Sequence, residues 1–253
     1  MFLKIKKIGS NEAKIRLIWL HGWGQNHKSF LLLADLFGNC QNILVDMAGF
    51  GDAPLPDKVW DTKDYAKDLF DYLQQENSVE KTYIIGHSFG CRVALRLSHQ
   101  FDNVVDGLIL ISAAGLKKKR SISFKIKSFI LRWIGKILQL IDYIFDSEFK
   151  KKYADKFGSA DYRNAKGLMR NIFVKVINED LSQIAGKIRI PTILIFGQND
   201  QETPPQFGKR YNKMLINSQY FELPNFNHYN ILSQGRYQLQ NIISNFIKNN
   251  DNS

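Results

Sequence analysis

Short apolar runs that alternate with amphipathic stretches constrain the fold of this chain most strongly. Five runs are rich in β-branched and other apolar residues: 14–20, 42–46, 82–86, 105–111 and 190–197. Apolar residues recur at helical spacing in three stretches: 62–76, 89–100 and 231–248. Runs that are apolar throughout are typical of strands buried on both faces. The alternation therefore predicts an α/β fold with a mostly parallel central sheet flanked by helices.

One long stretch, residues 116–186, interrupts this alternation. It contains no run typical of a buried strand, whereas apolar residues from Ile130 to Ile144 follow helical spacing. Helices are expected in three places: 124–145, around 148–157, and 161–178. We therefore predict an all-helical cap at 116–186, inserted into a core made of residues 1–115 and 187–253.

The charge of the chain is concentrated in this insert. The formal net charge is +11, and residues 117–175 carry sixteen Lys or Arg but only five Asp or Glu. The rest of the chain holds 19 residues of each sign. Because a field of one sign steers oppositely charged partners, the insert is expected to meet an anionic partner, unless it is simply a solvated lysine-rich surface. No recognition motif accompanies the charge, so nucleic acid is not expected.

The sequence Gly86-His87-Ser88-Phe89-Gly90 lies between the run at 82–86 and the helical pattern at 89–100. A G-x-S-x-G motif between a strand and a helix is typical of a nucleophile elbow, a tight turn that presents the serine above the sheet edge. Gly86 and Gly90 leave room for the turn, and the free N–H groups at the helix start stabilise negative charge. Ser88 is therefore the candidate nucleophile.

A serine hydroxyl needs a histidine as base, and that histidine needs an acid to orient it. Asp200 follows the run at 190–197, where the carboxyl end of a parallel strand places site residues. His228 follows another short strand at 220–223, which gives the chain order serine, acid, histidine. We predict Asp200 and His228 as the partners of Ser88, with Glu202 as the alternative acid.

The other histidines are assigned elsewhere. His99 lies within the helix after the elbow and is expected to face solvent. His87 is expected to point away from Ser88. His21 belongs to an early glycine turn, and His27 receives no role.

That early turn, Leu20-His21-Gly22-Trp23-Gly24, is the candidate oxyanion site. Gly22 and Gly24 allow close approach of the backbone, and the N–H groups of Trp23 and Phe89 would hold the oxyanion. Removing one such donor costs on the order of 3–4 kcal/mol of transition-state stabilisation.

Taken together, these motifs resemble the α/β-hydrolase family over nearly the whole chain. The matching features are His21-Gly22-Trp23-Gly24, Asp46 to Gly51, the elbow at Ser88, Gly197-x-x-Asp200, and His228. The sequence departs from the family at Ala48, Ala53 and Cys91, positions that are expected to be structural. The resemblance implies a serine hydrolase that cleaves carboxylic esters without a cofactor or metal. Dehalogenases and epoxide hydrolases are disfavoured, because those relatives have Asp where Ser88 stands.

Within the family, residues 20–26 resemble the esterases that cleave pimeloyl-[acyl-carrier-protein] methyl ester in biotin synthesis. That resemblance implies an acidic acyl carrier protein as the partner of the basic cap. Two alternatives stay open. One is a carbon–carbon bond hydrolase of the same fold. The other is a protein whose basic cap docks on a membrane surface or another partner, with secondary esterase activity. The membrane is not favoured, because the apolar face of the insert is expected to cover the site cleft.

Remaining features bear on location and on metals. The two cysteines, Cys40 and Cys91, suggest neither a disulfide framework nor a metal site. No run of about 18 apolar residues suggests a membrane span, and the start of the chain does not resemble a signal peptide. A cytoplasmic protein is expected.

Overall fold

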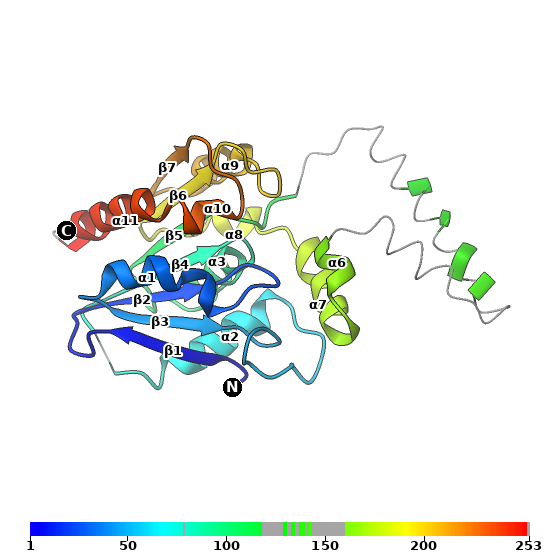
Figure 1. The fold of residues 1–253 in the computed structure, drawn as a ribbon, viewed down its shortest axis with the longest axis horizontal. Coiled ribbons are helices and arrows are strands. Elements are labelled where there is room, and N and C mark those ends of the chain that lie inside the picture. The colour runs from blue at the N-terminus through cyan, green and yellow to red at the C-terminus, as the bar shows by residue number, and fades with distance from the viewer. Residues whose placement is uncertain are drawn as a thin grey trace.

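The computed structural model describes residues 1–77, 79–117 and 160–251, together with 129–130, 133–134, 137–139 and 141–142. Its strands form one seven-stranded sheet in the order β1-β3-β2-β4-β5-β6-β7 (Figure 1). The strands are β1 Lys4–Gly9, β2 Ile15–Leu20, β3 Gln41–Asp46, β4 Lys81–His87, β5 Gly107–Ile111, β6 Thr192–Gly197 and β7 Ser218–Leu223.

All neighbouring strands are parallel except β1, which pairs antiparallel with β3. The five runs and the short strand at 220–223 thus correspond to β2–β7, and the predicted mostly parallel sheet is confirmed. The sequence reading missed β1. Its residues Lys4, Lys6 and Lys7 are exposed, so this edge strand lacks the apolar run by which the buried strands were recognised.

Helices cover both faces of the sheet because successive strand residues point to opposite sides. Ile18, Leu20, Ile43 and Val45 belong to one core cluster, packed with α2 (Thr62–Leu73), α3 (Phe89–Gln100), α8 (Ser182–Ala185) and α9 (Pro205–Met214). Leu17, Trp19 and Leu44 belong to the other cluster, packed with α1 (Leu31–Ala34), α10 (Asn230–Ser233) and α11 (Arg236–Asp251). Short 3₁₀ turns at His27–Phe30 and Asp35–Phe37 flank α1.

Two predicted helices are interrupted in the structure. The helix expected at 161–178 is divided into α6 (Ala160–Asn164) and α7 (Gly167–Asn178), because Lys166 is extended and Gly167 has a positive φ of 50°. The helix expected at 231–248 is divided into α10 and α11 before Arg236. Periodicity continued across both breaks, so the sequence pattern did not reveal them.

Residues 116–186 have helices where the structure describes elements in them. Figure 1 shows α6 and α7 beyond the carboxyl ends of the parallel strands. The described residues between 129 and 142 are helical, as expected for 124–145. The helix predicted around 148–157 lies outside the described residues.

The apolar side chains of this region do not all face the core. Phe129, Ile130, Trp133, Ile134 and Ile137 are between 37% and 62% exposed. The expectation that this apolar face covers the site cleft is therefore wrong for these residues. None of the helices in the described part of the chain is both long and apolar enough to cross a membrane.

Candidate active site

Ser88 occupies the sharp turn between β4 and α3. Its backbone has φ 49° and ψ −105°, a region that residues other than glycine rarely adopt. A Cβ at Gly90 would overlap the carbonyl oxygen of Leu20, and one at Gly86 would lie 2.8 Å from the Cys91 nitrogen. Both flanking positions must therefore be glycine for α3 to pack closely against the sheet. Below the turn, the Sγ of Cys91 is buried 3.1 Å from the Gly86 carbonyl oxygen.

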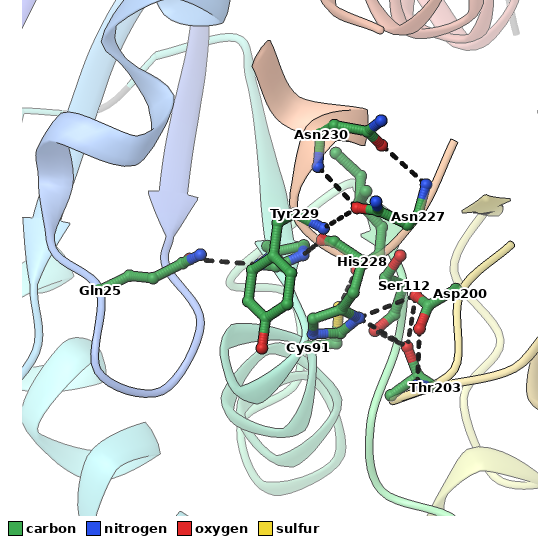
Figure 2. Close-up of polar contacts among 11 residues, drawn as sticks. Gln25, Cys91, Ser112, Asp200, Thr203, Asn227, His228, Tyr229 and Asn230 are labelled. Carbon is green, nitrogen blue, oxygen red and sulfur yellow. Dashed lines mark hydrogen bonds and ion pairs between the residues drawn. The ribbon is translucent and has the colours of Figure 1, made fainter. Parts of the chain in front are cut away.

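Asp200 and His228 meet at the carboxyl edge of the sheet (Figure 2). Asp200 follows β6, and His228 lies in the loop after β7. The Nδ1 atom of His228 lies 2.8 Å from Oδ2 of Asp200, and both residues are buried. The sequence placed both residues at strand ends, and the structure brings those ends together because β6 and β7 are parallel neighbours.

Thr203 is a partner of this pair that the sequence analysis missed. Its N–H donates to Oδ1 of Asp200 at 2.8 Å, and its hydroxyl lies 3.0 Å from Oδ2 and 2.9 Å from the Ser112 carbonyl oxygen. Burial alone would raise the pKa of Asp200. The hydrogen bonds from His228 and the Thr203 N–H outweigh burial and hold the pKa below its ordinary value.

The alternative acid, Glu202, does not take this place. Its side chain is exposed and lines the cavity, whereas the buried Asp200 contacts the histidine.

The loop that carries His228 is fixed by a reciprocal set of hydrogen bonds. The side-chain oxygen of Asn227 accepts from the N–H groups of Tyr229 at 2.9 Å and Asn230 at 3.0 Å. The Asn227 N–H donates to Oδ1 of Asn230 at 2.7 Å (Figure 2). Because both neighbours of His228 are held in this way, the imidazole is presented from a defined backbone.

A cavity of about 510 Å³ joins these parts. Ser88, His228, Trp23 and Phe89 all line it. No hydrogen bond joins the Ser88 hydroxyl to His228 within the described part of the chain. Such bonds are often long before substrate binds, so the shared cavity is the relevant observation.

The backbone N–H groups of Trp23 and Phe89 both belong to cavity-lining residues. Neither N–H donates to another residue that the structure describes. The Trp23 ring contacts Phe50, Phe89 and Phe173, with ring centroids 4.8, 5.3 and 5.0 Å away. Phe173 comes from α7, so the helical region after residue 160 forms part of the cavity wall.

Two further histidines lie close to the site: His87, which was expected to point away from Ser88, and His21, which belongs to the candidate oxyanion turn. His87 lines the cavity, and its Nε2 lies 2.9 Å from the carbonyl oxygen of His228. Burial lowers the pKa of His87 to about 3, so the ring is neutral and Nε2 donates this bond. His21 donates from Nδ1 to the Gly22 carbonyl oxygen at 2.7 Å and accepts the Met47 N–H at Nε2. Burial likewise lowers the pKa of His21 to about 4.

Of the remaining histidines, His27 pairs with Asp46 at 2.9 Å and lies outside the cavity lining. His99 is half-buried rather than fully exposed. Among the described residues, no group of three His, Cys, Asp or Glu side chains could hold a metal ion.

Comparison with known proteins agrees with this architecture. The family model for the α/β hydrolase fold matches residues 15–140. Lipase 3 of Moraxella sp. (strain TA144) is 22% identical over 230 residues, which cover 84% of this chain and 71% of that protein. A membrane phospholipase A superposes with a TM-score of 0.75 at 19% identity, covering 99% of this chain and 84% of that one.

The fold is also shared with enzymes of another chemistry. A meta-cleavage product hydrolase from Pseudomonas fluorescens superposes with a TM-score of 0.68 at 16% identity, covering 98% of this chain and 94% of that one. Likeness at this level of identity establishes the fold and leaves the substrate open. The family model, the relatives and the strand–elbow–helix arrangement around Ser88 agree, and this chain belongs to the α/β-hydrolase fold family.

Proposed function

We propose that this protein is a serine hydrolase that cleaves carboxylic esters through an acyl-enzyme intermediate. The observation that carries the proposal is the single cavity lined by Ser88 and by the Asp200-bound His228. Trp23 and Phe89 line the same cavity, and their N–H groups have no acceptor within the part of the chain that the structure describes. The lipase among the relatives supports ester chemistry as the reaction class.

The geometry defines the role of each group. The Nδ1–H of His228 donates a hydrogen bond to Asp200, which leaves Nε2 to accept the proton of the Ser88 hydroxyl as the oxygen attacks the ester carbonyl. The N–H groups of Trp23 and Phe89 hold the resulting oxyanion. His228 then returns the proton to the departing alcohol, and Asp200 stabilises the imidazolium meanwhile. Water, activated by the same histidine, releases the acid and restores Ser88.

The test is hydrolysis of a p-nitrophenyl ester series by the wild type and by Ser88→Ala. Because the acyl-enzyme cannot form without the hydroxyl, Ser88→Ala is expected to abolish turnover while circular dichroism shows an intact fold. Ser98→Ala is the matched control. Ser98 lies farther along α3 and outside the cavity lining, and among the described residues its hydroxyl bonds to the Ala94 carbonyl oxygen.

Equal activity in Ser88→Ala and wild type would contradict the proposal. Turnover of a ring-fission dienoate in place of every ester would favour the carbon–carbon hydrolase alternative.

Within this class, we propose a carrier-protein-bound methyl ester, such as pimeloyl-[acyl-carrier-protein] methyl ester, as substrate. The supporting features are the turn at residues 20–26 and the sixteen basic residues of 117–175, which complement an acidic carrier protein. Affinity for the carrier protein is expected to fall steeply as salt rises. Carrier-protein binding that does not depend on salt, or binding to anionic vesicles and not to the carrier protein, would contradict this substrate. Neither result would contradict ester hydrolysis itself.

A further inference from the structure

Arg92 is a buried cation in the wall of the catalytic cavity. It lies on α3 four residues after Ser88, and its side chain is only 7% exposed. Ser88 is the N-cap of α3, and Arg92 belongs to the first turns of that helix. Both residues line the same cavity.

The described residues neutralise this charge incompletely. Arg92 donates one hydrogen bond, from a terminal nitrogen to the Glu179 carbonyl oxygen at 3.2 Å, and no carboxylate in the described part of the chain lies within ion-pair distance of it. A guanidinium has five N–H donors, and a buried charge is costly unless it is paired. Burial accordingly lowers the pKa of Arg92 from its ordinary value.

Nearby carboxylates are engaged with other residues. The Glu179 carboxylate accepts from the Thr62 N–H at 2.9 Å and from Arg96 at 2.9 Å. The Asp180 carboxylate accepts the N–H of Ser182 at 3.1 Å. Both carboxylates attract Arg92 electrostatically from beyond ion-pair distance, and among the described residues only the Glu179 carbonyl accepts a hydrogen bond from it.

The cavity is also lined by charged residues of both signs, Lys117, Asp161 and Glu202. Asp161 and Glu202 interact electrostatically with each other and with Tyr229, and Asp161 also interacts with His228. The alcohol must leave on the His228 side, because that histidine protonates it. An acyl group that extends away from His228 would have the cavity-lining residues Phe89 and Arg92 of α3 available to contact it.

We propose that Arg92 binds a carboxylate at the far end of the acyl group, so that the preferred substrates are monoesters of short dicarboxylic acids. The planar guanidinium fork matches a carboxylate with two parallel hydrogen bonds. This inference rests on the proposed ester hydrolysis and specifies a substrate class different from the carrier-protein-bound ester, whose far carboxyl is joined to the carrier and is not a free carboxylate. It adds no chemical step, since the carboxylate is bound and does not react.

The first experiment compares kcat/KM for matched esters with one leaving group. Monomethyl succinate, glutarate and adipate are set against methyl butanoate, pentanoate and hexanoate. The wild type is expected to prefer the charged ester of at least one pair by about tenfold or more. Arg92→Gln is expected to remove that preference, and Arg92→Lys to restore part of it, since a lysine keeps the charge but lacks the fork.

Arg96→Gln is the matched control. Arg96 lies one turn farther along α3 and also contacts Glu179, but it is absent from the cavity lining. Its substitution is expected to leave the charged-to-neutral ratio unchanged. A charged-to-neutral ratio that falls equally in Arg92→Gln and Arg96→Gln would overturn the inference. It would show that Arg92 only supports α7 and does not bind the substrate carboxylate. If Arg92→Gln does not fold, the kcat/KM ratio of charged to neutral esters in the wild type decides: a ratio near one would overturn the inference.

A binding measurement separates the two proposals. Calorimetry with glutarate and the Ser88→Ala protein is expected to show binding that is lost in Ser88→Ala/Arg92→Gln. If the protein hydrolyses neutral esters, shows no preference for charged esters and does not bind glutarate, the Arg92 inference is overturned and the proposed ester hydrolysis is not. If the protein binds glutarate but hydrolyses no ester, the anion site is supported and the proposed reaction is contradicted.

Discussion

Thr203 acts on the Asp200 carboxylate from two atoms, its backbone N–H and its hydroxyl. The hydroxyl also lies 3.2 Å from Nδ1 of His228, so it touches both members of the pair. Since Asp200 orients the imidazole, loss of one of its contacts should allow the ring to depart from its productive direction. At the residue scale, Thr203 is therefore a positioning residue for the proposed base.

The substitution Thr203→Val tests this role, because it keeps the shape of the side chain and removes only the hydroxyl. We expect kcat to fall by roughly tenfold, corresponding to about 1–2 kcal/mol for a lost hydrogen bond to a charged group, with KM nearly unchanged. The measurement is steady-state kinetics on a p-nitrophenyl ester. Thr192→Val is the control, since that threonine is equally buried in β6 but bonds to the Ile190 carbonyl oxygen. An unchanged kcat in Thr203→Val would rule the role out.

At the scale of elements, Glu179 ties the end of α7 to two helices of the core. Its carboxylate accepts from the N–H and the hydroxyl of Thr62, at the start of α2, and from Arg96 on α3. The Glu179 side chain is 17% exposed and that of Arg96 is 12% exposed, so water screens this cluster weakly. Since α7 supplies Phe173 to the cavity wall, Glu179 holds that wall against the core.

We expect Glu179→Ala to lower the free energy of unfolding by about 2 kcal/mol, because it leaves Arg96 and the start of α2 without their acceptor. Chemical denaturation measures the loss, and hydrogen exchange should rise in α7 more than in the sheet. Glu80→Ala is the control. Its ion pair with Lys14 is more than half exposed on both sides and should contribute little. Equal losses in the two variants would show that Glu179 is only a surface residue.

At the scale of the whole molecule, burial of His21 and His87 couples stability to pH. Burial lowers their pKa from 6.5 to about 4 and about 3 respectively. Below pH 6.5 the two imidazoles become protonated in the unfolded chain, whereas in the folded chain they stay neutral until the pH approaches their lowered pKa values. The free energy of unfolding therefore falls as pH decreases from 6.5 toward 4, and is insensitive to these two groups above that range.

The size of this effect can be measured directly. His21 alone is expected to contribute a loss on the order of 3 kcal/mol by pH 4. Urea denaturation at a series of pH values between 7.5 and 4.5 checks the slope. His87→Gln, which removes one of the two groups, should show a shallower decrease than the wild type. A free energy of unfolding that is constant from pH 7 to pH 5 would contradict the prediction.

The distribution of charge is also a property of the whole chain. The sheet and its helices are close to neutral, and the excess of positive charge lies between residues 117 and 175. Five apolar side chains between Phe129 and Ile137 are exposed in the same stretch. Sequence periodicity identified the four of them from Ile130 to Ile137 as part of one apolar face, but it could not say what that face contacts, because amphipathicity defines a face and not its partner.

Local patterns in the sequence were sufficient for the order of the elements from β2 onward and for the strand ends at which the candidate site residues lie. Strands β2 to β6 are recognisable because burial on both faces requires apolar runs, and the elbow at Ser88 because its turn tolerates only glycine on both sides. Asp200 and His228 could be placed from the sequence because parallel strands end at one edge of the sheet.

Tertiary structure alone decided the contacts between residues distant in sequence. Segments from separate parts of the chain are joined by Thr203 on the Ser112 carbonyl, His87 on the His228 carbonyl, Phe173 on Trp23 and Arg92 on the Glu179 carbonyl. Each residue type is ordinary at its position, so no periodicity or motif marks it. The physical reason is that a local pattern records which face of an element is buried, whereas the partner on that face depends on how the elements pack.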